Sequence, residues 1–396
     1  MIASFANILW ILFQLLIGYN LVFPILLYLI YLLKGKPSFT VQHHSAEADY
    51  AIIVTAYEQT HTLPPVIDSL LQLQYNNYLI YIVADKCDIS NLKFDDERVI
   101  VLRPEETLAS NTRSHFYAIH HFKRKHERLT IIDSDNLVEP TYLSQLNIYF
   151  DRGFEAVQGE RKAKNLDTTV ACVDAARDVY YHYFDGQILF AVGSSATLAG
   201  SGMAFTVDLY RNCLEHLDIT GAGFDKVLQK EILSRKYRIA FTKDAIVYDE
   251  KTSRSDQLVK QRARWINTWF KYFKFGFILI GKGVANFNWN QFLFGFILLR
   301  PPLFIFLILS FFLLLINVFI DPSVALIWLT GFALFTAGFF IALLNSDTDK
   351  RIYQSLGGIP KFIFYQILSL LKVRKANKHS VATQHFYDKK LDEVKE

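Results

Sequence analysis

The sequence predicts an α/β protein with a mainly parallel sheet, attached to a membrane by three helices. Between about residues 38 and 285, short runs rich in Val, Ile and Tyr alternate with helical patterns, which is typical of βαβ units. Long apolar tracts lie instead at the two ends of the chain. With 396 residues, the chain has room for a soluble domain beside these tracts.

The apolar tracts predict three membrane spans. Residues 5–33 carry no charged side chain and are long enough to cross a hydrocarbon core of about 30 Å. Basic residues follow this tract instead of preceding it, so we expect an uncleaved anchor and not a signal peptide. Two further tracts, residues 292–320 and 324–344, are separated by a turn at Asp321 and predict a membrane hairpin.

Basic residues predict the orientation of the spans. Lysines and arginines flank the spans toward the central region and the C-terminal tail, which places both in the cytoplasm and the N-terminus outside. We therefore expect a cytoplasmic domain over residues 38–255, an interfacial helix region over 256–285 and a cytoplasmic tail over 345–396. Within the tail, residues 359–371 are a candidate interfacial helix. The expected location is the plasma (inner) membrane, with membrane lipid as a partner.

Composition excludes several classes of partner. The net charge of +4 comes mostly from the lysines that flank the spans, and no separate basic stripe is present, so no nucleic acid is expected. The three cysteines are too few and too scattered for a disulfide framework or a zinc site.

Polar side chains follow three of the predicted strands. In an open parallel sheet the ligand lies beyond the carboxyl ends of the strands, so one crevice is expected to collect all three clusters. The clusters follow the apolar runs at residues 50–54, 78–84 and 129–132. They contain Thr55, Tyr57 and Glu58, then Asp85, and finally Asp133 and Asp135.

Asp133 and Asp135 are a candidate metal pair. Side chains two positions apart on an extended segment point the same way, so both carboxylates face one cation. Hard oxygen ligands suit Mg²⁺ or Mn²⁺, and such an ion takes the rest of its shell from water and substrate phosphates. The alternative is a polar turn after a strand, which two aspartates at this spacing also form by chance.

Three further segments contain candidate site residues. Helical spacing places Gln261, Arg264 and Trp265 on adjoining positions of one face, where guanidinium suits diphosphate and indole suits a sugar ring. An interfacial helix is the alternative, because Trp and Arg also populate membrane boundaries. Asp225 follows a glycine-rich loop, and it is a candidate general base or a helix cap. Gly202 permits close backbone approach to a ligand, or forms only a turn.

The order of these segments resembles the family 2 glycosyltransferases with a GT-A catalytic domain. That group includes cellulose, chitin and hyaluronan synthases and ceramide glucosyltransferase. The resemblance covers about residues 50 to 270. The matching stretches, in the family's order, are IVTAYE, VADKCD, IIDSDN, GSGMAF, FDKVLQKEIL, AIVYDEK and QRARW.

The resemblance implies roles for individual residues. It implies that Asp85 contacts the uracil or ribose of a UDP-sugar, that Asp133 and Asp135 hold the diphosphate and its metal, and that Asp225 is the catalytic base. It also implies that the QRARW segment clamps the diphosphate and lines the acceptor site. Thr55, Tyr57, Glu58 and Arg264 are expected on the donor side, and Gly202, Gln261 and Trp265 on the acceptor side.

Two departures from the family pattern are present. Phe224 stands where an acidic residue usually precedes the base, and a lysine usually found after the second strand pair has no match, so that Arg113 is the candidate substitute.

The implied activity is an inverting, metal-dependent sugar transfer from a UDP-sugar to a glycan acceptor, in polysaccharide synthesis. One alternative is a single addition to a lipid acceptor. An alternative of another class is a non-catalytic subunit of a polysaccharide synthesis or export complex, which the loss of acid at Phe224 favours. The donor sugar, the acceptor and the presence of a homo-oligomer or an export partner stay open.

Overall fold

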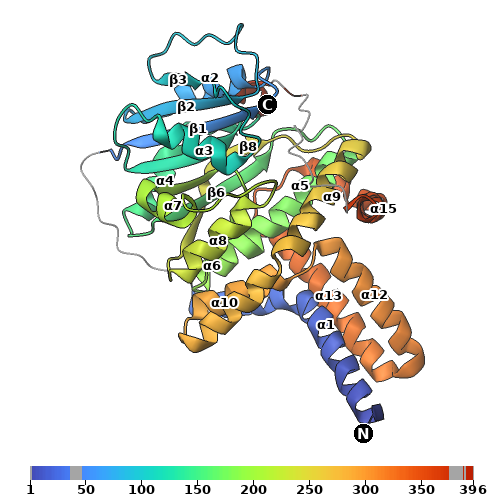
Figure 1. Ribbon diagram of the computed structural model, residues 1–396. Helices are drawn as coiled ribbons and strands as arrows, with labels where there is room; N and C mark the ends of the chain where they lie inside the picture. The colour runs from blue at the N-terminus through green and yellow to red at the C-terminus, as the bar shows by residue number, and fades with distance from the viewer. Residues whose placement is uncertain (1, 36–46, 374–386, 388, 396) are drawn as a thin grey trace.

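The computed structural model describes residues 2–35, 47–373, 387 and 389–395. An α/β domain lies above a bundle of apolar helices, with the N-terminus at the far end of the bundle (Figure 1). Residues 389–395 lie beside the sheet of this domain (Figure 1).

In the described part of the chain, the strands form one eight-stranded sheet with the order β3-β2-β1-β4-β7-β6-β8-β5. The strands are β1 (Tyr50–Tyr57), β2 (Tyr78–Asp85), β3 (Val99–Leu102), β4 (Arg128–Asp133), β5 (Leu137–Val138), β6 (Ala156–Ala163), β7 (Met203–Thr206) and β8 (Ile239–Asp249).

The β3-β2-β1-β4 part of the sheet is parallel, as the alternating pattern predicts. Residues 51–54 of β1 are fully buried, because β1 lies between β2 and β4 and helices cover the sheet. The register pairs Thr55 of β1 with Asp133 of β4, and Tyr57 with Asp85 of β2. The polar residues at these strand ends therefore meet at one edge.

The other half of the sheet is mixed. The short strand β7 is antiparallel to both β4 and β6, and β5 is antiparallel to β8, whereas β6 and β8 are parallel. The sequence pattern predicts a mainly parallel sheet, and the structure confirms it for the half that begins the domain. A turn at Gly202, which has a φ of +66°, leads into β7.

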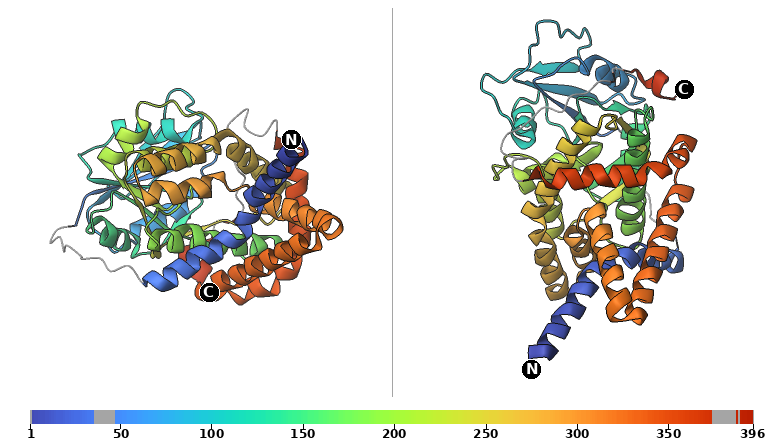
Figure 2. Two further views of the ribbon diagram at one scale, coloured as in Figure 1. Left: turned by 90° about the horizontal axis from the view of Figure 1, so that it is seen from below. Right: turned by 90° about the vertical axis from the view of Figure 1, so that its right-hand side faces the viewer.

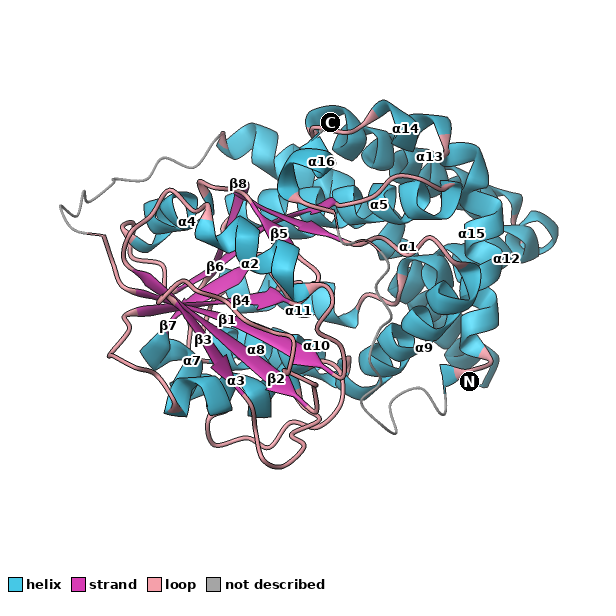
Figure 3. Cartoon of the chain, turned by 90° about the horizontal axis from the view of Figure 1, so that it is seen from above, coloured by secondary structure: helices cyan, strands magenta, loops and turns pink. Residues whose placement is uncertain are grey.

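Helices pack on both faces of the sheet, with α2 and α4 on one side and α3 and α7 on the other (Figure 3). The helices of this domain are α2 (Leu63–Leu71), α3 (Asn111–His120), α4 (Tyr142–Phe150), α5 (Thr169–Tyr181), the π-helix η1 (His182–Ile188), α6 (Leu189–Ala191), α7 (Val207–Leu214) and α8 (Phe224–Ser234). Helix α3 ends at His120.

Among the described residues, three helices are long and apolar enough to cross a membrane, as predicted. They are α1 (Ile2–Lys34), α12 (Leu303–Ile320) and α13 (Pro322–Asn345). Their shared core contains Ile17, Leu21, Phe306, Leu313 and Trp328. Hydrogen bonds from Asn317 and Trp328 to Gln14 also join the three helices, because polar side chains away from water need partners.

The expected span over residues 292–320 is divided. Helix α11 (Trp289–Leu299) ends before Arg300, and α12 begins only at Leu303. Pro301 and Pro302 lack the N–H groups that would continue a helix, and proline also disfavours helical geometry at the residue before it. Arg300 is buried and pairs with Asp185 of η1, so the break connects the bundle to the α/β domain.

The region 256–285 forms two helices, α9 (Ser255–Tyr272) and α10 (Lys274–Ala285). Helices α14 (Lys350–Gln354), η2 (Leu356–Gly358) and α15 (Ile359–Leu370) follow the spans, and α16 (Leu391–Lys395) lies near the C-terminus. In the right-hand view, helix α15 (red) runs across the long axes of α12 and α13 (Figure 2). Helix α15 covers most of residues 359–371, for which an interfacial helix was predicted, and the segment is exposed at Phe364 and Leu371.

Candidate active site

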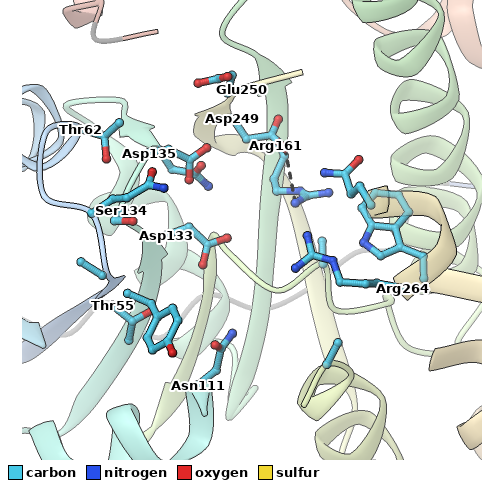
Figure 4. A pocket seen from close by; sticks show the side chains of 18 of the residues that line it. Thr55, Thr62, Asn111, Asp133, Ser134, Asp135, Arg161, Asp249, Glu250 and Arg264 are labelled. Carbon is cyan, nitrogen blue, oxygen red and sulfur yellow. Dashed lines mark ion pairs between the residues drawn. The ribbon is translucent and has the colours of Figure 1, made fainter. Parts of the chain in front are cut away.

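A pocket of about 370 Å³ opens at the carboxyl ends of the parallel strands. Aspartates from the strand ends lie on one side of it, and Arg161 and Arg264 lie opposite (Figure 4). Of the residues predicted from the sequence, the pocket is lined by Thr55, Tyr57, Asp85, Asp133, Asp135, Gln261, Arg264 and Trp265. The predicted crevice is therefore present, and it collects the three strand ends with α9.

Ser201 holds the segment that carries Asp133 and Asp135. The backbone N–H of Asp133 donates to Ser201 Oγ at 3.0 Å. The hydrogen-bond pattern is best satisfied when the Asn136 amide donates to Asp135 Oδ1 at 3.0 Å and accepts from Ser201 Oγ at 2.7 Å. Asp135 is buried and Asp133 is partly exposed, so the pair is set into the wall of the pocket.

Gly202 does not line the pocket, contrary to the expectation of an acceptor contact. Its N–H donates to Ile131 at 2.9 Å and its carbonyl accepts from Gly159 at 2.8 Å. A Cβ at this position would lie 3.1 Å from Val247. Gly202 is needed because of its left-handed backbone and close packing, which place Ser201 behind Asp133.

Asp85 binds backbone groups of the loop before α3. Its Oδ1 accepts the N–H of Leu108 at 2.9 Å and its Oδ2 accepts the N–H of Ala109 at 2.8 Å. Each carboxylate oxygen has a second lone pair for a ligand. Asp85 therefore shapes the wall formed by Ala109, Ser110 and Asn111 as well as lining the pocket itself.

Glu58 lies outside the pocket lining, unlike its neighbours Thr55 and Tyr57. It has a φ of 61° and pairs with Lys86 at 2.7 Å on the surface. Arg113, the candidate substitute for a missing lysine, pairs with Asp218 at 2.8 Å and is also absent from the lining.

Asp225 is not among the residues that line the pocket. It lies in the first turn of α8, its side chain is 20% exposed, and its nearest ion-pair partner is Lys226 at 3.5 Å. Gly221 and Ala222, from the loop before α8, do line the pocket. Phe224 is buried and packs edge-on against His115, so it replaces an acidic residue with part of the apolar core.

One wall of the pocket is lined by charged side chains that the sequence did not lead us to predict. It consists of Arg161 from β6, Asp174, Arg177 and Asp178 from α5, and Asp249, Glu250 and Lys251 from the end of β8. Lys251 pairs with Asp178 at 2.5 Å and with Asp249 at 2.6 Å, and Arg161 pairs with Asp249 at 3.4 Å. The helical i, i+3, i+4 spacing of the three α5 residues was the signal available in the sequence.

Burial and ion pairing shift the pKa values of side chains in this wall and of Arg264 beside it. Burial alone would raise the pKa of Asp178, but Arg177, Lys251 and Arg161 hold it well below its ordinary value. Burial raises the pKa of Asp249. Burial lowers the pKa of Arg264. The wall therefore contains both a firmly ionised carboxylate and one that accepts a proton more readily.

The C-terminal segment touches the rim of the pocket. The backbone N–H of Tyr387 donates to Glu250 at 3.2 Å, and its carbonyl accepts from Lys164 at 2.6 Å. Lys164 also donates to the carbonyl of Asp135 at 3.1 Å. Leu391 of α16 is buried, which fixes this segment against the domain.

The carboxylate oxygens of Asp133 and Asp135 are ligands of the type that Mg²⁺ and Mn²⁺ prefer. Within the described residues, no group of three or more His, Cys, Asp or Glu side chains is placed to hold a metal ion. Mg²⁺ is usually held by one or two carboxylates and completes its shell with water and phosphate oxygens, so a complete protein cage is not required.

Comparisons with known proteins agree with this geometry. Residues 47–268 match the family model described as glycosyltransferase like family 2. No curated protein sequence matches the chain. The mannosyltransferase PcManGT from Pyrobaculum calidifontis, in complex with GDP-Man and Mn²⁺, has a TM-score of 0.54 and 13% identity, with 91% of this chain and 98% of that chain covered.

S. aureus TarS, residues 1–349, is a second solved structure with some likeness. Its TM-score is 0.41 at 12% identity, with 83% of this chain and 90% of that chain covered. The likeness to PcManGT shows a common GT-A-like fold. Because the family model covers more than half of the sequence, the chain belongs to the glycosyltransferases of the family 2 type.

Proposed function

We propose that this protein transfers a sugar, with inversion, from a UDP-sugar to a membrane-associated acceptor at the cytoplasmic face. The observation that supports this most is the single pocket in which the strand-end aspartates face Gln261, Arg264 and Trp265 of α9. These segments are far apart in the sequence. A metal-binding pair, a guanidinium and an exposed aromatic ring are the groups that donor and acceptor require.

The donor binds at the strand ends in this proposal. Asp133 and Asp135 would hold Mg²⁺ or Mn²⁺, which would supply Lewis-acid stabilisation to the departing diphosphate. Arg264 donates its N–H groups to the same phosphates from the opposite wall. Thr55, Tyr57 and Asp85 line the same pocket, and in this proposal they lie on the nucleoside side of the donor.

The metal assignment has a direct test. Replacing Asp133 and Asp135 with Ala is expected to eliminate the stimulation of UDP release by divalent ions. Asp88→Ala is a matched control, because Asp88 is an exposed carboxylate outside the pocket lining. If EDTA has no effect on the wild-type protein, the enzyme works without a metal and the assignment is wrong.

We assign the general base to Asp225, on the support of its motif and of the pocket-lining loop directly before it. In this role its carboxylate takes the proton from the acceptor hydroxyl as that oxygen attacks the anomeric carbon. Asp249 is the competing candidate, because it lines the pocket and burial raises its pKa.

The two variants Asp225→Asn and Asp249→Asn separate these candidates. Asp225→Asn is expected to abolish transfer while the Kd for UDP changes less than about twofold, since the base does not contact the nucleotide. If Asp225→Asn transfers sugar and Asp249→Asn does not, Asp249 is the base. Calorimetric titration with UDP provides the binding measurement.

The packing of the spans supports a lipid acceptor as the second candidate. The sequence favours polysaccharide synthesis, but α1, α12 and α13 fill their common interface with apolar side chains and with the hydrogen bonds to Gln14. Such packing favours a single addition to a membrane lipid over export of a polymer through this chain. A long ladder of radiolabelled product would establish polymer synthesis, and a single glycolipid would exclude it.

The donor itself is best found by a screen. Purified protein in detergent is incubated with UDP-glucose, UDP-N-acetylglucosamine, UDP-galactose and GDP-mannose together with a membrane lipid extract, and nucleotide release is measured. We expect release from one UDP-sugar above the others. Release from none of them would favour the non-catalytic subunit, and preferential release from GDP-mannose would refute UDP specificity.

A further inference from the structure

Arg262 lies within the QRARW segment but faces away from the pocket. It is absent from the pocket lining, and only 2% of its surface is exposed. Its Nη2 pairs with Oδ1 of Asp174 on α5. The guanidinium carbon lies 3.9 Å from the centroid of the Trp265 ring, at a distance typical of a cation–π contact.

A second arginine meets the same two partners. Nη2 of Arg177 lies 3.1 Å from Oδ1 of Asp174, and its guanidinium carbon lies 4.5 Å from the centroid of the Trp265 ring. We refer to Asp174, Arg177, Arg262 and Trp265 as the tryptophan clamp. One carboxylate thus fixes two cations, and both cations contact one indole ring.

Burying such a cluster of charged side chains costs free energy unless each charge has a partner that compensates for its lost hydration. Burial lowers the pKa of Arg262 to about 10, which leaves the side chain charged at neutral pH. An isolated buried guanidinium is strongly unfavourable, so Asp174 and the ring of Trp265 compensate for its lost hydration. Trp265 itself is 41% exposed and lines the pocket, so the clamp holds its ring from the protein side.

The clamp also connects the pocket to the membrane bundle. Asp174 and Arg177 lie on α5, which ends at Tyr181. The ring of Tyr180, one turn beyond Arg177, lies 5.7 Å from Phe335 and 6.2 Å from Phe339 on α13. Helix α5 therefore connects the Trp265 ring to the membrane spans, because it carries both Arg177 and Tyr180.

We infer that Arg262 and Asp174 are positioning residues that hold the Trp265 ring in place for an acceptor presented at the membrane. This inference deepens the proposed function and rests on it for the identity of the ligand. Arg262 does not line the pocket, so in this inference it acts on the acceptor through Trp265. Without the clamp, the ring samples other rotamers and the acceptor must order it on binding, which weakens acceptor binding but not donor binding.

Fluorescence measures the clamp independently of any activity. The chain has five tryptophans, and the difference between wild type and Trp265→Phe isolates the signal of Trp265. We expect Arg262→Gln to increase the acrylamide quenching of this signal by about twofold. Arg254→Gln is the matched control, since Arg254 directly precedes the same helix, is exposed and lies 3.6 Å from Asp256. Unchanged quenching in Arg262→Gln would overturn the inference.

Kinetics distinguish positioning from a merely structural role. In native membranes supplied with a UDP-sugar, Arg262→Gln is expected to reduce incorporation into the endogenous acceptor by about tenfold. The Kd for UDP and the slow release of UDP with water as acceptor are expected to change less than twofold. Arg262→Lys, which keeps a cation beside Asp174 and the ring, is expected to restore part of the loss.

A double-mutant cycle completes the test. In the Trp265→Phe background, Arg262→Gln is expected to change incorporation by less than about twofold, because the ring that it positions is already altered. An equal loss in both backgrounds, or a parallel loss of UDP binding and incorporation, would show that Arg262 only stabilises the fold. If the wild-type protein releases no nucleotide, the proposed function fails, while the quenching result still decides whether the clamp exists.

Discussion

The substitution Asp85→Asn tests whether Asp85 organises the wall of the pocket. The two oxygens of the aspartate accept the N–H groups of Leu108 and Ala109 at 2.9 and 2.8 Å. Asparagine keeps one oxygen and presents an NH₂ group to the other N–H. One charge-assisted bond is lost, the remaining bond becomes a neutral one, and a donor is left without its acceptor.

The magnitude follows from these bonds. A hydrogen bond to a charged group contributes about 1.5–3 kcal/mol and a neutral one about 1 kcal/mol. Ala109 also has a φ of +47°, a conformation that costs a residue with a Cβ about 1–2 kcal/mol and that these bonds help to maintain. We therefore expect the free energy of opening this loop to fall by about 2–4 kcal/mol.

Hydrogen exchange followed by mass spectrometry is the assay. A loss of about 2–4 kcal/mol corresponds to exchange that is roughly 30-fold to several hundred-fold faster in the peptide containing Leu108 and Ala109. UDP affinity is expected to fall as well, because Ala109 to Asn111 line the pocket. Asp88→Asn is the control, since Asp88 accepts the N–H of Ser90 at 2.9 Å in an exposed turn.

Two results would refute the reasoning. If exchange in this peptide is unchanged while UDP affinity falls, Asp85 acts on the nucleotide alone and the backbone bonds are unimportant. If both quantities are unchanged, neither role is correct.

Three further predictions test packing, charge and topology. Gly202→Ala is expected to lower Tm more than Gly153→Ala, because both have positive φ but only the Cβ at Gly202 meets another side chain, at 3.1 Å; equal shifts would refute the packing argument. Burial raises the pKa of the Glu160 carboxyl group from 4.5 to about 7, so the folded state binds the carboxyl proton more tightly than the unfolded state does. The folded state therefore loses stability as the pH rises through this range. Glu160→Gln is therefore expected to raise stability by up to about 3 kcal/mol at pH 8, with little change at pH 4, and a uniform effect would contradict this cause. The native cysteines are buried, so a membrane-impermeant maleimide on intact cells is expected to label Ser323→Cys and not Lys350→Cys; the reverse pattern would invert the topology.

Local sequence patterns predicted the strands that form the donor side of the pocket. The run at residues 78–85 is β2 and the run ending at Asp133 is β4, because parallel strands buried on both faces require continuous apolar sequence. The polar residue that ends each run then lies at the carboxyl edge of the sheet. Thr55 and Asp133, which are paired in register, follow from this rule alone.

Longer-range features were not predictable in this way. The helix break at Arg300 was overlooked because the tract is apolar on both sides, although Pro301 and Pro302 were a local signal for it. Gly202 was expected at the acceptor side, but its place behind Ser201 depends on pairing between β7 and β4. Asp225 has a plausible motif, yet whether a side chain in the first turn of α8 reaches the pocket depends on how that helix packs.

By itself, the sequence determined the α/β class, the three apolar spans and the position of Asp133 at a strand end with Asp135 two positions after it, because each depends on the periodicity or chemistry of neighbouring residues. Only the tertiary structure decided that Asp174, Arg177 and Lys251 join the pocket, and that Arg262 turns from it to hold Trp265. Buried charges are retained only where partners from other elements compensate for lost hydration, and those partners are defined by the packing of α5, β8 and α9.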